Sequence, residues 1–212
     1  LIDKAIHFEE KKGACVARNE GAKLAEGKYL SFLPADAVLY PGSARIWHDH
    51  LEEFKEYDFL YGGYRLIDET GEPLPGSDFF FQPFEPYILE VSNYIDGSFP
   101  IRKESYWKFA KIMYGENAEG LWDPNIKSLQ DWDFWLSVVL NGGKGLYYQD
   151  IFFGTTPPHQ GGLSDDSHKN WLERTESIKA KHSIPIRTLC VASLGAGFHA
   201  KRTAYTLKAD FK

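Results

Sequence analysis

Residues 13–39 read GACVARNEGAKLAEGKYLSFLPADAVL, and this stretch decides the fold class. Small and apolar residues are spaced through residues 13–26 in a pattern that predicts a helix. Residues 28–33 alternate like a buried strand that ends at Pro34. Asp36 follows directly, and ligands gather at the carboxyl ends of strands in open α/β sheets. The stretch therefore predicts a helix–strand unit with an aspartate at the ligand-binding edge.

Outward from this unit, helical and strand patterns continue along the chain. We expect strands at residues 58–68, 99–102 and 146–153, and helices at residues 43–57, 104–114, 129–141 and 169–182. Residues 69–73 have the composition of a hairpin turn. Residues 73–95 are rich in Pro and Phe and give no clear pattern. This mixture of helices and strands predicts an α/β domain.

The composition is that of a globular protein. The chain has 212 residues, 43% of them hydrophobic and 25% charged. A net charge of -6 without a Lys/Arg run argues against nucleic acid as a partner. No stretch approaches the roughly 18 apolar residues of a membrane span. Cys15 and Cys190 are not spaced as ligands or as a disulfide framework, so we expect a reducing, cytoplasmic location, either free or peripheral at the membrane.

The opening stretch resembles the central signature of family 2 glycosyltransferases, G-x-x-x-ARN-x-G-x-x-x-A-x-G-x-Y-hydrophobic-x-F-L-D-x-D-D. The shared positions are Gly13, Ala17, Arg18, Asn19, Gly21, Ala25, Gly27, Tyr29, Phe32, Leu33 and Asp36. The resemblance implies a GT-A type nucleotide-diphospho-sugar transferase fold, with a mostly parallel sheet and helices on both faces. It also implies transfer of a sugar from a nucleotide-sugar donor to an acceptor.

By this resemblance, Asp36 contacts a divalent cation, Mg²⁺ or Mn²⁺, which neutralises the diphosphate leaving group. Hard cations prefer such oxygen ligands. The chain departs from the family at Pro34 and Ala37, where the family is acidic, so we expect weak metal binding. The alternative is that Asp36 caps the next element. Arg18 and Asn19 are expected to bind the donor, with capping and local pairing as the alternative.

A second motif, QDWDFW at residues 130–135, resembles the E/Q-D-W-D-x-W segment of the same family. By resemblance, Asp131 is the general base that takes the proton of the acceptor hydroxyl in an inverting transfer. A first-turn carboxylate favoured by the helix dipole is the alternative. Asp133 projects from another helix face, so the two do not form a glycosidase pair, and dipole and solvent contact explain it equally well. We expect Trp132 and Trp135 to pack in the core, with acceptor stacking as the alternative.

A third motif, TTPPHQGGLS at residues 155–164, resembles the family's Y-R-x-H-x-G-S-x-S loop. The resemblance places His159 near the metal or the donor phosphates, although the family's Arg is absent. A solvated loop histidine is the alternative. Arg102 and Lys103 precede a helix, and we expect them to be a solvated pair, with contact to phosphate as the alternative.

Nothing before Gly13 resembles the family's first strands, so we expect an N-terminally incomplete fold and a longer parent chain. Residues 1–182 are expected to form the later part of the GT-A-like domain. Residues 183–212 read as a strand and a helix around a G-x-G-x-x-A loop at 195–200. The start of a second domain, a permuted first strand and helix, and a simple closing unit all fit; we favour the first.

The leading hypothesis is glycosyl transfer to a carbohydrate or lipid-linked acceptor in glycan or polysaccharide synthesis. A non-catalytic carbohydrate-binding or assembly module is the alternative, because the acidic partners and the donor half of the signature are missing. A glycoside hydrolase is disfavoured by the carboxylate spacing. The 16% aromatic content fits either a large core or platforms for sugar rings.

Overall fold

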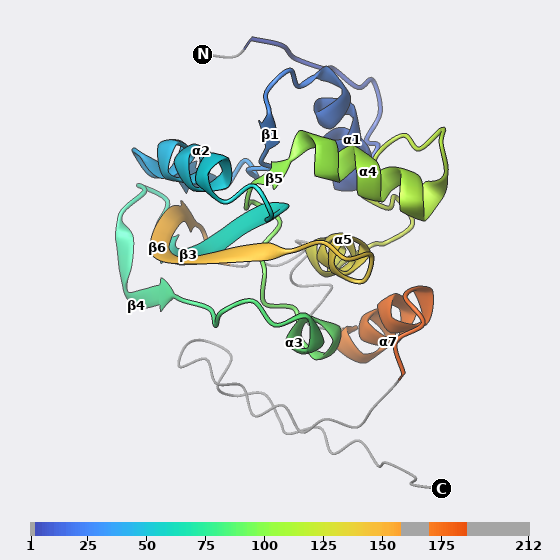
Figure 1. Cartoon of the computed structure of the whole chain (residues 1–212). Helices are drawn as coiled ribbons and strands as arrows, with labels where there is room; N and C mark the ends of the chain where they lie inside the picture. The colour runs from blue at the N-terminus through green and yellow to red at the C-terminus, as the bar shows by residue number, and fades with distance from the viewer. Residues whose placement is uncertain (1–2, 158–169, 186–212) are drawn as a thin grey trace, which may run out of the picture.

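The computed structural model describes residues 3–157 and 170–185. The helices are α1 (Ala14–Leu24), α2 (Ser43–Glu53), α3 (Pro86–Val91), α4 (Lys103–Tyr114), α5 (Gln130–Val139) and α7 (Trp171–Lys181). The strands are β1 (Tyr29–Leu30), β2 (Ala37–Leu39), β3 (Phe59–Ile67), β4 (Pro73–Phe79), β5 (Ile101–Arg102) and β6 (Gly145–Thr155). Figure 1 shows their arrangement. His159, Cys190 and the loop at residues 195–200 lie outside the described residues.

The strands form one mixed sheet in the order β1-β5-β3-β6-β2. The additional strand β4 pairs with the later part of β3, beyond the residue that pairs with β5. Among the described residues, only the central β3–β6 pairing is parallel, and the other pairings are antiparallel. The α/β class is therefore confirmed, but the sheet of the described residues is not mostly parallel. One cause is the tight turn between β3 and β4, in which Gly71 has φ +91. Such a short turn returns the chain in the opposite direction, so the two strands are antiparallel.

The expected elements are largely confirmed, with one notable difference after α1. The strand expected at residues 28–33 shrinks to the two residues of β1. The chain then turns at Pro34, whose carbonyl accepts a hydrogen bond from Ala37 N at 3.2 Å, and starts the unexpected strand β2. Proline has no amide hydrogen to donate to a strand neighbour. The segment without a clear pattern, residues 73–95, contains β4 and α3.

The core is aromatic and centres on α5. Residues 132–139 of this helix are all buried. Trp135 packs on Phe59 of β3 with ring centroids 4.4 Å apart, and Phe134 stacks on Trp122 at 4.3 Å. Trp132 and Trp135 are both 0% exposed, so their expected role in packing is confirmed. Replacing a buried aromatic of this kind by Ala typically costs about 3–5 kcal/mol.

Both faces of the central strand are covered. Residues 59–63 of β3 are buried in succession, and successive strand residues point to opposite faces of a sheet. Helix α5 contacts β3 through Trp135, and α2 contacts the neighbouring β6 through Trp47 and Phe152, whose rings are 5.5 Å apart. Within residues 3–157 and 170–185, no helix combines the length and apolar character needed to cross a membrane.

Candidate functional site

The fold brings the first two sequence motifs together, although they lie more than a hundred residues apart. Arg18 on α1 donates from Nη1 to Oε1 of Gln130 at 3.0 Å, and its guanidinium lies 4.3 Å from the ring centroid of Trp122. A cation above an indole ring is attracted by the ring's quadrupole. The α1 signature and the QDWDFW helix therefore form one face of the site.

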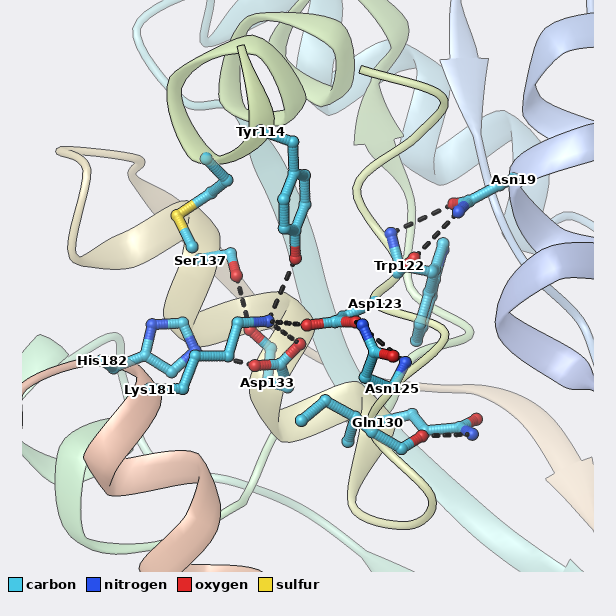
Figure 2. A network of polar contacts seen from close by, with 12 residues as sticks. Asn19, Tyr114, Trp122, Asp123, Asn125, Gln130, Asp133, Ser137, Lys181 and His182 are labelled. Carbon is cyan, nitrogen blue, oxygen red and sulfur yellow. Dashed lines mark hydrogen bonds and ion pairs between the residues drawn. The ribbon is translucent and has the colours of Figure 1, made fainter.

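The neighbouring Asn19 is engaged in the fold. Its Oδ1 accepts hydrogen bonds from the Trp122 amide at 3.1 Å and the Tyr106 hydroxyl at 2.9 Å. Its Nδ2 donates to the Trp122 carbonyl at 2.8 Å, as Figure 2 shows. A Cβ on Gly120 would lie 2.3 Å from the Asn19 side chain, so only glycine fits beside it. These contacts support the pairing alternative for Asn19, and its role in donor binding stays a prediction.

Asp131 stands in the first turn of α5. The preceding Leu129 has φ 58, an uncommon left-handed conformation for a residue with a side chain, and it directs the chain into the helix. Oδ1 of Asp131 accepts a hydrogen bond from the amide of Trp132 at 2.9 Å. The helix N-terminus thus holds the carboxylate in place and favours its negative charge.

The surroundings of Asp131 raise its pKa to about 6. Burial is the largest cause, because it disfavours the charged form, and the negative charge of Asp96 adds to it. A hydrogen bond from Asn93, the amide of Trp132 and the charge of Arg18 oppose the rise. A carboxyl with an ordinary pKa near 3.9 is a weaker base. Asp131 is therefore mostly ionised at neutral pH, yet able to take up a proton.

Sequence reasoning missed Asn93 and Asp96. Both lie on the loop between α3 and β5, in or next to the Pro- and Phe-rich segment without a clear periodicity. The Asp96-Gly97 pair is a turn signal, and Asp96 Oδ1 does accept the amide of Ser98 at 2.7 Å. No spacing along the chain connects this turn to Asp131, which is 35 positions further on.

Asp133 has a different environment from Asp131. Asp133 is 1% exposed, so the alternative of solvent contact is wrong. Oδ2 pairs with Lys181 Nζ at 2.8 Å, and Oδ1 lies 2.8 Å from Nε2 of His182. Lys181 also pairs with Asp123 at 2.8 Å and contacts the Tyr114 hydroxyl at 3.0 Å. Figure 2 shows this network, which fastens the end of α7 to α5.

The network also stabilises the charge of Lys181. Burial alone lowers the pKa of a lysine ammonium, but the carboxylates of Asp133 and Asp123 outweigh burial and raise its pKa above the usual value. A buried carboxylate that is fully paired in this way is a structural group. Asp133 is thus unavailable for proton transfer, while Asp131 has no cationic partner at hydrogen-bond distance among the described residues.

Asp36 lies exposed between β1 and β2. It precedes a strand and caps no helix, since Gly42 stands at the N-cap of α2. Its carbonyl accepts the amide of Thr156 at 3.1 Å, and its Oδ2 is 3.4 Å from the Thr156 hydroxyl. The third motif therefore begins beside Asp36. These oxygens are suitable for Mg²⁺ or Mn²⁺, but no group of three His, Cys, Asp or Glu that could hold a metal occurs among the described residues.

Arg102 and Lys103 are not a solvated pair. Arg102 is 6% exposed, and it donates to the carbonyls of Tyr57, at 2.7 Å, and Leu51. Lys103 Nζ donates to the carbonyl of Ala25, just after α1. The carbonyls at helix C-termini lack partners within the helix, and cations are favoured there. Both side chains therefore fasten β5 and α4 to the ends of α2 and α1.

Two grooves of the described residues lie away from Asp131. One, of about 510 Å³, runs between residues 3–8 and α1, and the other, of about 310 Å³, lies beside Asn19 and Trp122. Neither is lined by Asp131 or Asp36. The candidate site is therefore defined by the chemistry around Asp131 and not by the size of a cavity.

Comparison with known proteins identifies the family. The profile described as glycosyl transferase family 2 matches residues 4–110. The glycosyltransferase TuaG of Bacillus subtilis, whose name assigns it to teichuronic acid biosynthesis, is 30% identical over 153 residues, covering 66% of this chain and 52% of TuaG. WcaA of Escherichia coli, named for colanic acid biosynthesis, is 26% identical over 141 residues, covering 66% of this chain and 47% of WcaA.

Solved structures agree on the fold. Residues 1–349 of TarS from S. aureus superpose with a TM-score of 0.55 at 18% sequence identity, covering 82% of this chain and 46% of that one. The same part of TarS in complex with UDP-GlcNAc gives a TM-score of 0.51 at 17% identity, covering 77% and 45%. The chain spans about a fifth to a half of the length of the relatives it matches. With its profile matching just over half of the chain, this protein belongs to glycosyl transferase family 2 and has part of a GT-A type of fold.

Proposed function

We propose that this chain carries the catalytic base and part of the donor site of an enzyme that transfers a sugar from a nucleotide-sugar donor to a hydroxyl group, with inversion, in polysaccharide synthesis. Family membership and the names of TuaG and WcaA support the reaction class and the pathway class. The complex of TarS with UDP-GlcNAc supports a nucleotide-sugar donor. A cytoplasmic location and further domains in the same polypeptide belong to this proposal.

The observation that carries the proposal is the environment of Asp131. Its carboxylate is fixed at the start of α5, and its pKa is raised to about 6, close to the pH at which a general base works best. In the proposed step, an acceptor hydroxyl oxygen forms a bond to the anomeric carbon. The bond from that carbon to the nucleotide diphosphate breaks, and Asp131 receives the hydroxyl proton.

Donor binding is assigned to the first and third motifs. We propose that Asp36 and His159 would hold a divalent cation, whose chemistry is to neutralise charge on the departing diphosphate. The contact between Asp36 and Thr156 supports this, because it brings the start of the third motif to Asp36. Arg18 and Asn19 are proposed to border the donor, Arg18 by its charge and Asn19 by holding the loop that contains Trp122.

The test is turnover by the full-length protein. Wild type, Asp131→Asn and the exposed control Asp49→Asn are incubated with Mn²⁺ and UDP-GlcNAc, UDP-glucose, UDP-galactose or GDP-mannose, and release of the nucleoside diphosphate is measured. We expect wild type and the control to release it from at least one donor. Asp131→Asn should lose about 10²–10⁴-fold in kcat. No turnover of any donor by wild type favours the non-catalytic module, and an active Asp131→Asn variant refutes the assignment of the base.

A further inference from the structure

The loop between α3 and β5 is fixed against Asp131 by the two tryptophans of the QDWDFW motif. Nε1 of Trp132 donates to the carbonyl of Leu89 at 2.6 Å, and Nε1 of Trp135 donates to the carbonyl of Asp96 at 3.1 Å. Both indoles are buried, so these hydrogen bonds are shielded from water. The motif therefore supplies the carboxylate and also holds the segment that faces it.

Gly97 lets this loop approach closely. A Cβ at this position would lie 3.3 Å from Cβ of Asp131 and 2.9 Å from the Trp122 ring. The second distance is too short for any side chain to be accommodated without movement of the buried indole. The backbone at Gly97 is thus packed directly on the first turn of α5.

The side chain of Asn93, on the same loop, acts on Asp131. The two side chains are hydrogen-bonded, and this bond lowers the pKa of Asp131. The amide oxygen of Asn93 is buried and has no hydrogen-bond partner among the described residues, and only Nδ2 of this amide can donate to a carboxylate. A carboxylate that accepts an N–H hydrogen bond is held in one orientation.

Asp96, the residue before Gly97, carries a second carboxylate. Its negative charge acts on Asp131, and the charges of Asp96 and Asp131 both act on the hydroxyl of Tyr64 in β3. Burial is the main cause of the raised pKa of Tyr64, and the two carboxylates add to it. The carbonyl of Asp96 accepts a hydrogen bond from Nε1 of Trp135, and its carboxylate accepts one from the amide of Ser98.

We propose that Asn93 and Asp96 are positioning residues for the base, with Asn93 orienting the carboxylate of Asp131 and Asp96 holding a second negative charge beside it. The proposal rests on the function proposed above for Asp131. The groups that act on Asp131 are Asp96 and Asn93 from the loop, Arg18 from α1 and the amide of Trp132 in α5 itself.

The experiment is a titration of Asp131 by ¹³C NMR in the full-length protein labelled at aspartate carboxyl carbons, with the resonance assigned by its loss in Asp131→Asn. We expect the midpoint to fall by about one pH unit in Asp96→Asn, because a like charge is removed. It should rise by about one pH unit in Asn93→Leu, because a donor is removed. Asp96→Glu keeps the charge and should stay near wild type, and the remote Asp49→Asn should not change the midpoint.

Unchanged midpoints in both loop variants, or shifts of the same sign, overturn the proposal. If Asn93→Leu does not fold, the contrast between Asp96→Asn and Asp96→Glu decides alone. The titration needs neither donor nor acceptor. Opposite shifts together with an active Asp131→Asn enzyme therefore refute the proposed function only, whereas an inactive Asp131→Asn enzyme with unchanged midpoints refutes the loop proposal only.

Discussion

Replacing the proposed base should make the protein more stable at neutral pH. The pKa of Asp131 is raised to about 6 from an ordinary value of 3.8. A carboxyl whose pKa is raised on folding binds its proton more tightly in the folded state. Its contribution to stability is therefore fully present below about pH 4 and is lost as the pH rises through about 6. Above that pH the folded state bears the cost of an ionised, partly buried carboxylate.

The magnitude follows from the difference between the two pKa values. Each pH unit corresponds to about 1.4 kcal/mol, so a difference of about two units sets an upper limit of about 3 kcal/mol. Asn has nearly the same shape as Asp and does not ionise. We therefore expect Asp131→Asn to raise the free energy of unfolding by about 1–3 kcal/mol near pH 7, and by close to nothing near pH 4.

The assay is urea unfolding of wild type and Asp131→Asn between about pH 4 and pH 7, followed by tryptophan fluorescence. Subtracting the two curves cancels the titration of the groups that do not interact with Asp131, and leaves that of Asp131 together with its coupling to Asp96. The exposed control Glu56→Gln, at a position with no ion pair among the described residues, should show no such pH-dependent difference. A variant that is equally stable or less stable near pH 7 refutes the reasoning, because the carboxylate is then not held in an unfavourable environment.

Three further predictions concern the surrounding structure. Lys181→Met leaves Asp133 buried beside His182 alone, so the free energy of unfolding should fall by about 3–5 kcal/mol in urea titrations, and a loss below about 1 kcal/mol contradicts a buried pair. Gly120→Ala should lower the free energy of unfolding by about 2 kcal/mol or more in the same assay, because the added Cβ meets the buried Asn19 side chain. The control is Gly115→Ala, where the added Cβ has open space, so that only the cost of the positive φ is measured. Asp36→Ala in the full-length protein should abolish the Mn²⁺-dependent part of UDP binding in calorimetry; unchanged binding removes Asp36 from the metal site.

The sequence by itself determined the family, the α/β class and most of the helices. These properties depend on local information. The spacing of apolar residues predicted α1, α4 and α5 within a few residues, and the QDWDFW motif placed Asp131 in the first turn of a helix. The aromatic character of residues 130–135 also predicted correctly that Trp132 and Trp135 are buried.

Only the tertiary structure decided which side chains meet. Asp131 and Asp133 are neighbours in one motif, yet one faces Asn93 and Asp96, and the other is paired with Lys181 and His182. These partners lie 35 to 49 positions away along the chain, and no periodicity records a contact at such a separation. The pKa of each carboxyl depends on burial and on neighbouring charges, which exist only once the chain has folded. The sequence motif was enough to single out the two aspartates, but their chemistry depends on the tertiary fold.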